Sequence, residues 1–275
     1  MLTFCLFVIA IVAYLLGAVN GAIIASKYIF KKDIRDFGSG NAGLTNFYRI
    51  FGTKGILIVL AIDILKTAAA VFLGWVLLHI YGYGMVGKLF AGFFVMLGHA
   101  FPVYYGFKGG KGVLCGGILV LMLDWRIGLI CWAVFALAVL FTRYVSLGSI
   151  CAGIMLPIGV AIFGGWWLQV VLGVACGLLL VIMHRENIFR LIAGKERKLS
   201  FGGADDKRRQ ARRDKWAERR AEAEAEREAA RAAREAEAAA GEAEGAAEEE
   251  AREQAGAARK RAFRLLEEET DEEDN

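Results

Sequence analysis

Seven apolar runs dominate the first 194 residues of this chain and restrict what it can fold into. A helix needs roughly 20 apolar residues to cross the ~30 Å hydrocarbon core of a bilayer. Most of the runs reach or approach that length; they cover residues 2–25, 55–80, 85–105, 113–123, 127–142, 145–165 and 166–183. The sequence therefore predicts an all-α, polytopic membrane protein.

The placement of charge indicates how many runs cross. Lys27, the first basic residue, follows the first run, whereas a signal peptide carries positive charge before its apolar stretch. We therefore expect a first transmembrane helix with the N-terminus outside. Seven transmembrane helices put most loop lysines and arginines on the cytoplasmic side, as the positive-inside rule requires, and the C-terminus inside. The run 113–123 is too short to cross unless its helix begins earlier, near Gly109.

The chain changes character near residue 194. Residues 1–194 contain 14 Lys/Arg against 5 Asp/Glu, a net charge of +9, and residues 195–275 contain 19 basic against 24 acidic residues, a net charge of −5. Ala, Glu and Arg dominate the second region, a composition typical of disordered or solvated helical segments. We predict a membrane domain over 1–194 and a charged, low-complexity cytoplasmic tail over 195–275, whose protein partners the sequence does not indicate.

A glycine-rich polar segment follows the first run. It reads GSGNAGLTN, with an arginine one turn further on. Glycines let successive backbone N–H groups converge on an anion, and hydroxyl, amide and guanidinium groups add donors. The candidate phosphate-binding residues are Gly38, Ser39, Gly40, Asn41, Gly43, Thr45, Asn46 and Arg49.

Two further polar segments are predicted on the same face of the membrane. One contains a histidine and the loop FKGGKG, which opens a helix whose N-terminus favours anions. The other, HREN, closes the last apolar run. Two glycine-rich loops with cations on one face predict a ligand that carries phosphate. The candidate residues of these segments are His99, Lys108, Gly109, Gly110, Lys111, His184 and Asn187.

Asp63 and Lys66 interrupt the second apolar run. At a spacing of i and i+3 they share one face of a helix and can pair. Because unpaired charges are costly within a membrane, we expect a structural ion pair that faces the interior of the bundle.

Several other kinds of site are missing from the sequence. A nucleotide-binding P-loop would need Gly at Tyr105 and Ser or Thr at Gly112. None of the three histidines is followed five residues later by Asp, so the common His-x-x-x-x-Asp acyltransferase motif is absent. The five cysteines form no C-x-x-C pair. We expect no metal site, no cofactor and no nucleic-acid partner.

Three segments resemble the signature motifs of the PlsY-type acyl-phosphate:glycerol-3-phosphate acyltransferases. They read DIRDFGSGNAGLTN, GHAFPVYYGFKGGKGV and HRENIFRLIAGKE. Their order and spacing on a seven-span protein match as well, and the pair of Asp63 and Lys66 is familiar from the same family. The resemblance covers about residues 1–198 and omits the tail.

The resemblance implies an enzyme of the bacterial cytoplasmic (inner) membrane with its active site facing the cytoplasm. It would transfer a fatty acyl group from acyl phosphate to the sn-1 hydroxyl of glycerol 3-phosphate, giving lysophosphatidic acid and inorganic phosphate, the first acylation of phospholipid biosynthesis. Catalytic roles would fall to Ser39, His99, Lys108, Lys111, His184 and Asn187. The remaining glycine-loop residues, with Arg49, would bind substrate phosphate.

Two questions stay open in the sequence. The hydroxyl proton goes either to a substrate phosphate oxygen or to His99 or His184 as a general base. The chain is either an enzyme or a transporter of phosphorylated anions, for which we would expect charges along a midplane path and inverted repeats. One intramembrane pair and no repeat between the halves favour the enzyme. A membrane scaffold acting through its tail would lose activity on tail deletion, whereas we predict that deletion at Lys198 leaves catalysis intact.

Overall fold

The computed structural model describes residues 1–199, 216, 219–220 and 222–232. These residues form helices and connecting loops, and none of them lies in a strand. The chain divides into two compact units, residues 1–206 and 207–275. In the second unit, residues 222–232 form an exposed helix. Most of the predicted tail lies outside the described residues, but 195–199 belong to the first unit rather than the second.

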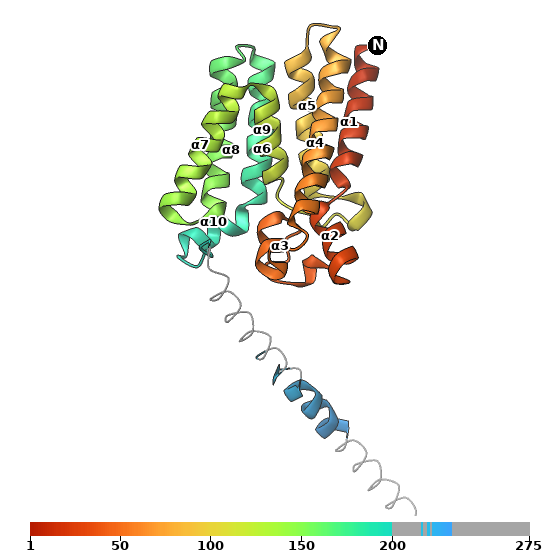
Figure 1. Cartoon of the computed structure of the whole chain (residues 1–275), viewed down its shortest axis with the longest axis vertical. Helices are drawn as coiled ribbons and strands as arrows, with labels where there is room; N and C mark the ends of the chain where they lie inside the picture. The colour runs from red at the N-terminus through yellow and green to blue at the C-terminus, as the bar shows by residue number, and fades with distance from the viewer. Residues whose placement is uncertain (200–215, 217–218, 221, 233–275) are drawn as a thin grey trace, which may run out of the picture. The chain divides into compact units, whose positions relative to one another are not determined.

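The first unit is a bundle of helices (Figure 1). Its helical elements are α1 (Leu2–Ala18), α2 (Gly21–Phe30), η1 (Ile34–Asp36), α3 (Leu44–Phe51), α4 (Ile56–His79), α5 (Gly84–Ala100), η2 (Val103–Tyr105), α6 (Val113–Leu123), α7 (Trp125–Thr142), α8 (Val145–Phe163), α9 (Trp167–Met183) and α10 (Arg185–Ile192).

Five segments of the described chain are long and apolar enough to cross a membrane, or up to six if α9 and α10, bent by 58° at their junction, count as one span. The five are Leu2–Phe30, Ile56–His79, Gly84–Tyr105, Trp125–Thr142 and Val145–Phe163. Helix α6 has only 11 residues and does not begin near Gly109. Gly112, in the left-handed region at φ +77°, ends the loop immediately before it.

The first apolar run is two helices rather than the single one expected over residues 2–25. Helix α1 ends at Ala18 and α2 begins at Gly21. Asn20 causes the change, because its side-chain oxygen accepts a hydrogen bond of 3.1 Å from the backbone N–H of Ile23 and so caps α2. Its amide nitrogen donates to the carbonyl oxygen of Ala42 at 3.1 Å, which connects the break to the first glycine-rich segment.

Small residues let the helices pack closely. A Cβ built on Gly74 of α4 would lie 2.2 Å from the carbonyl oxygen of Gly87 of α5. A Cβ built on Gly98 of α5 would lie 2.1 Å from the carbonyl oxygen of Tyr14 of α1. Such backbone approach is the usual basis of helix association in membranes. Helices α1, α4 and α5 form one side of the bundle and α7, α8 and α9 the other, with α6 between them (Figure 1).

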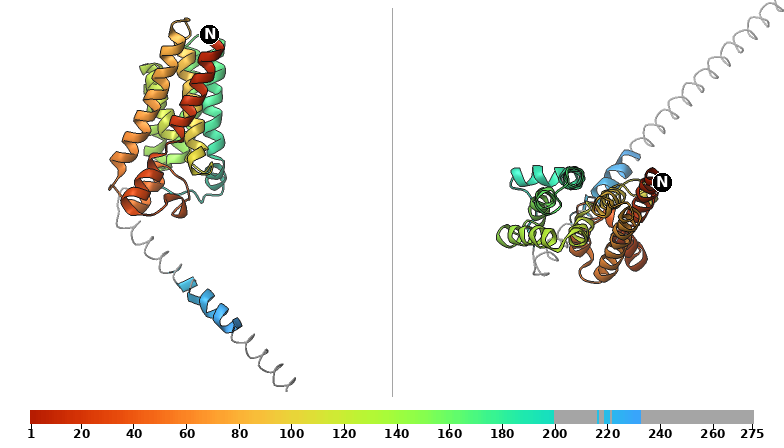
Figure 2. Two further views of the ribbon diagram at one scale, coloured as in Figure 1. Left: turned by 90° about the vertical axis from the view of Figure 1, so that its right-hand side faces the viewer. Right: turned by 90° about the horizontal axis from the view of Figure 1, so that it is seen from above.

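Helices α2, α3 and α10 all lie at the end of the unit opposite the N-terminus (Figures 1 and 2). All three polar segments of the sequence are at this end. The bundle thus brings together segments that are up to about 150 residues apart in the chain, as the topology predicted.

Candidate active site

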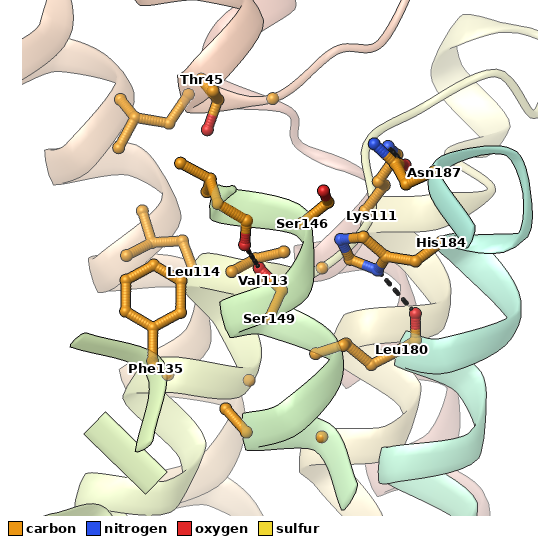
Figure 3. Close-up of a pocket in the computed structure, with 18 of the residues that line it drawn as sticks. Thr45, Lys111, Val113, Leu114, Phe135, Ser146, Ser149, Leu180, His184 and Asn187 are labelled. Atoms are coloured by element: carbon orange, nitrogen blue, oxygen red, sulfur yellow. Dashed lines mark hydrogen bonds between the residues drawn. The ribbon is translucent and has the colours of Figure 1, made fainter. Parts of the chain in front are cut away.

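A single cavity of about 540 Å³ joins the polar segments to the interior of the bundle (Figure 3). Its polar end lies among α3, the loop before α6 and the start of α10. Its other end runs between α6, α7, α8 and α9. The residues that line this second part are mostly apolar or small and include Leu114, Val120, Cys131, Trp132, Phe135, Gly153, Leu156 and Cys176.

Asn46 organises the first glycine-rich loop. Its side-chain oxygen accepts a hydrogen bond of 3.1 Å from the backbone N–H of Ser39. Its amide nitrogen donates to the carbonyl oxygens of Phe37 at 3.0 Å and Asn41 at 3.1 Å. Gly38 is required beside it, because its φ is +67° and a Cβ there would lie 2.3 Å from the Asn46 oxygen. Asn46, predicted to bind phosphate, therefore shapes the loop from within.

The second glycine-rich loop packs against the first. The backbone N–H of Ala42 donates to the carbonyl oxygen of Gly109 at 3.3 Å. The guanidinium of Arg35 donates to the carbonyl oxygen of Tyr105 at 2.6 Å. A Cβ on Gly110 would lie 2.2 Å from Nε2 of His99 and 2.7 Å from the carbonyl oxygen of Ala42. Glycine is needed at 110 because no larger residue fits between the two loops.

Three helices begin at the cavity without a side-chain cap. They are α3, α6 and α8, and Leu44, Val113 and Val145, their first residues, all line it. The first backbone N–H groups of a helix have no partner within the helix and carry the positive end of its dipole. Their convergence makes the polar end suited to bind phosphate.

A hydrogen-bonded cluster forms the opposite wall of the polar end. The carboxylate of Glu196 accepts from the Ser146 hydroxyl at 2.8 Å, the Asn187 amide at 2.7 Å and the Arg190 guanidinium at 2.8 Å. Although burial opposes ionisation, these three hydrogen bonds lower the pKa of Glu196 below its ordinary value. The fixed amide of Asn187 in turn accepts a hydrogen bond from the ammonium of Lys111.

Lys111 is the partly buried cation of this cluster. Burial, together with the nearby charge of Arg190, lowers the pKa of Lys111 to about 8. A lysine that is desolvated in this way gains more from an incoming phosphate than a fully hydrated one does. Lys111 is therefore placed to hold the negative charge of a ligand in the cavity.

His184 faces the same cluster with a defined tautomer. Its Nδ1 lies 2.8 Å from the carbonyl oxygen of Leu180, and since a carbonyl only accepts, Nδ1 carries the proton of the neutral ring. Nε2 then holds a lone pair. Figure 3 shows the ring between Leu180 and the side chains of Ser146 and Lys111, so this lone pair is directed into the polar end of the cavity.

Most predicted site residues meet at this cavity. It is lined by Gly38, Ser39, Asn41, Gly43, Thr45, Asn46, Arg49, His99, Lys111, His184 and Asn187. Gly40 and Gly109 line a smaller neighbouring cavity of about 170 Å³. Lys108 lines neither; it is exposed at the surface. Asp63 and Lys66 form the predicted ion pair, with Nζ and Oδ1 separated by 2.7 Å.

Several residues that line the cavity were not predicted from the sequence, among them Ser146, Ser149, Arg190, Glu196 and Arg197. Arg190 and Glu196 belong to the segment HRENIFRLIAGKE, so a signal for them was present. Ser146 and Ser149 carry no motif of their own. In the part of the chain that the structure describes, no group of three or more His, Cys, Asp or Glu side chains is placed to hold a metal ion.

The fold and cavity define a class: a helical membrane protein that combines a polar, cationic cavity end with an apolar channel between its helices. Such a site suits a reaction between a polar phosphate and a lipid. The sequence model of the glycerol-3-phosphate acyltransferase family matches residues 7–194. The chain therefore belongs to this family, the PlsY acyltransferases, and is an integral membrane enzyme.

Individual relatives support the assignment of the chain to this family. The glycerol-3-phosphate acyltransferase of Thermoanaerobacter pseudethanolicus is 40% identical over 190 residues, which cover 69% of this chain and 93% of the relative. Glycerol-3-phosphate acyltransferase 2 of Bacillus anthracis is 40% identical over 191 residues, 69% and 96% of the two chains.

Solved structures extend the similarity to three dimensions. The crystal structure of PlsY (YgiH), an integral membrane glycerol 3-phosphate acyltransferase, in its glycerol 3-phosphate form has a TM-score of 0.63 at 33% identity, covering 71% of this chain and 96% of the other. The lysophosphatidic acid form of PlsY has a TM-score of 0.62 at 32% identity, with coverage of 71% and 95%.

Proposed function

We propose that this protein transfers a fatty acyl group from an acyl phosphate to the sn-1 hydroxyl of glycerol 3-phosphate, releasing lysophosphatidic acid and inorganic phosphate. The observation that carries the proposal is the continuity of one cavity. Its polar end, with three uncapped helix N-termini and Lys111, suits the phosphate groups of both substrates. Its apolar end, between α6 and α9, suits one acyl chain.

The chemistry requires few catalytic groups. The hydroxyl oxygen of glycerol 3-phosphate attacks the acyl carbonyl carbon, and the bond from that carbon to the phosphate oxygen breaks. Because phosphate is a good leaving group, the protein mainly has to orient two anions and stabilise the negative charge that develops. Ser39, Arg49, Lys111 and Asn187 line the polar end and serve this purpose, and Lys108, which lies at the surface, is proposed to attract phosphate toward the cavity.

The hydroxyl proton passes to an oxygen of the departing phosphate in this proposal. No carboxylate pairs with His184, whose Nδ1 is engaged by the Leu180 carbonyl within the described structure. The rival acceptor is the Nε2 lone pair of His184. If His184→Ala reduced turnover by several orders of magnitude while substrate binding was unchanged, the histidine rather than the substrate would be the base.

Seven crossings of the bacterial cytoplasmic membrane, with the N-terminus outside, are part of the proposal. Helix α6 would supply the fourth crossing, and the loop 106–112 before it would lie at the cytoplasmic end of the bundle. The polar end, α10 and the tail would then face the cytoplasm, where glycerol 3-phosphate is met. The opposite end would carry Lys88 and Arg126.

The experiment is an assay of the purified full chain in lipid nanodiscs. Palmitoyl phosphate and glycerol 3-phosphate are supplied, and both inorganic phosphate and lysophosphatidic acid are measured. We expect the two products in equal amounts, and far less product with the thioester palmitoyl-CoA. Lys111→Met is the matched negative control, since it keeps the side-chain length and removes the charge.

Two results would contradict the proposal. Phosphate release without lysophosphatidic acid would show hydrolysis rather than transfer. No product with either long or short acyl phosphates, combined with uptake of labelled glycerol 3-phosphate into sealed vesicles, would assign the chain to transport.

A further inference from the structure

Asp63, Lys66 and His99 form a buried polar cluster that the reaction described above leaves without a role. Their exposed fractions are 1%, 6% and 4%. The cluster lies where α4 and α5 meet the break between α1 and α2. Charged groups in such a position are costly unless they are fully bonded, so their partners indicate what they do.

Lys66 forms hydrogen bonds with backbone groups at the break between α1 and α2. Its ammonium donates to the carbonyl oxygens of Gly17 at 3.2 Å and Val19 at 2.7 Å. Asp63 accepts from the backbone N–H of Gly21 at 3.3 Å. Backbone groups that leave a helix inside a membrane need partners within the protein. The ion pair supplies them on both sides of Asn20.

Lys66 also sets the tautomer of His99. Nδ1 of His99 lies 3.0 Å from Nζ of Lys66 and 3.8 Å from Oδ1 of Asp63. Only the first distance is that of a hydrogen bond. Since an ammonium has donors and no acceptor, Nδ1 accepts, and the proton of the neutral ring is on Nε2.

Nε2 of His99 faces the junction of the two glycine-rich loops. A Cβ on Gly110 would lie 2.2 Å from it, and His99 lines the cavity. Within the described residues, the protein provides no hydrogen-bond partner for this nitrogen. The N–H donor of His99 thus lies at this junction, beside the cavity that His99 lines, whereas His184 presents a lone pair to the polar end.

We propose that Lys66 is a positioning residue, which holds His99 as a donor of one hydrogen bond from Nε2 to an anionic oxygen of the bound substrate. The hydrogen bond from His99 to the substrate rests on the proposed function. The tautomer of His99, which Lys66 holds, does not depend on that function. His99 is then excluded as the general base, because its cavity-facing nitrogen already carries a proton and the other is bonded to Lys66.

The tautomer is tested without substrate. The chain has three histidines, so the full-length protein labelled with ¹⁵N-histidine gives three ring spectra, assigned by substituting His79 and His184 in turn. We expect a protonated Nε2 and an unprotonated Nδ1 for His99, and the reverse for His184. A His99 ring protonated on Nδ1 would overturn the proposal.

The role of Lys66 is tested with two matched double variants, Asp63→Asn/Lys66→Met and Asp63→Asn/Lys66→Gln. Both variants remove the two buried charges together. They differ at position 66, where glutamine still donates hydrogen bonds and methionine does not. We expect the methionine variant to lose its fixed tautomer and to fall in kcat by about 10-fold or more relative to the glutamine variant, with a smaller change in KM. Equal tautomers and equal kcat in two folded variants would contradict the assignment.

A second pair of variants does not depend on the folding of the charge-free protein. The amide nitrogen of His99→Gln reaches the position of Nε2, whereas that of His99→Asn reaches only the position of Nδ1. We expect the glutamine variant to retain more activity, and the opposite order would overturn the donor role. If the wild-type protein shows the expected tautomer but no acyl transfer, the proposed function fails while the positioning of His99 by Lys66 stands.

Discussion

The carboxylate of Glu196 accepts a hydrogen bond of 2.8 Å from the hydroxyl of Ser146, fifty residues earlier in the chain. The same carboxylate fixes Asn187, whose oxygen accepts from Lys111. The segment after α10 therefore forms part of the cavity wall, and the backbone N–H of Leu199 bonds the carbonyl oxygen of Arg143 at 2.6 Å. A membrane domain ending at residue 194 would lack this wall.

The position of Glu196 predicts a sharp boundary for truncation. Removing all residues after Leu199 leaves the hydrogen bonds of Glu196 intact and should leave acyl transfer close to wild type. Removing all residues after Gly194 deletes the carboxylate. Since hydrogen bonds to charged groups contribute about 1.5–3 kcal/mol each, activity should fall by about 10-fold or more. Initial rates of lysophosphatidic acid formation measure the difference.

Glu196→Gln in the full-length chain is the control for that prediction, because it keeps the shape and removes the charge. It should lose as much activity as the chain that is truncated after Gly194. Full activity after truncation at Gly194 would show that the cavity wall on this side is dispensable.

The pKa of Lys111 predicts how activity depends on pH. Burial and the charge of Arg190 lower this pKa to about 8, so the free enzyme holds the ammonium below that pH and loses it as pH rises. We expect kcat/KM to decrease above about pH 8, and kcat to decrease only at higher pH, because bound phosphate stabilises the charge. Lys111→Arg should lower the overall rate and remove the decrease. An unchanged profile in this variant would assign the titration to another group.

The contact between Gly110 and His99 predicts that even a methyl group disrupts the site. In Gly110→Ala the added carbon meets Nε2 of His99 at 2.2 Å and the carbonyl of Ala42 at 2.7 Å, so the two glycine-rich loops must separate. A displacement of about 1 Å can reduce turnover by about 100-fold. Gly173→Ala in α9 is the control, since its nearest contacts are at 3.4 Å, and it should retain activity. Equal rates for the two variants would contradict the tight junction.

The apolar part of the cavity predicts which residue limits acyl-chain length. Ala152 of α8 is partly buried and lines this part, so Ala152→Phe should fill it and shift the preference toward shorter acyl phosphates. Each methylene that is no longer buried costs about 0.8 kcal/mol. Competition between acyl phosphates of different length, with products separated by mass, measures the shift.

Ile154→Phe is the matched control for the chain-length prediction. It places the same phenyl ring two residues away on the same helix, where the side chain is 52% exposed on the outside of the bundle. The chain-length profile should stay that of the wild type. A shift in this variant, or none in Ala152→Phe, would place the acyl chain elsewhere.

Much of the architecture followed from local patterns. The apolar runs predicted the helices α4, α5, α7, α8 and α9 to within a few residues. The spacing of Asp63 and Lys66 predicted their ion pair, since residues three apart on a helix meet regardless of the rest of the fold. The break at Asn20 was not predicted, because the apolar run continues through it and the cap depends on a bond to Ala42 on another element.

The sequence by itself determined that the chain is helical and apolar, that its cations and glycine loops favour one side, and which motifs are candidates for binding phosphate. These properties depend on residue type and short spacing. Only the tertiary structure decided that Glu196 and Ser146 complete the cavity wall and that Lys66 directs the proton of His99. Each of these depends on a distance of 3.0 Å or less between residues 33 to 50 positions apart, and the packing of the helices alone sets such distances.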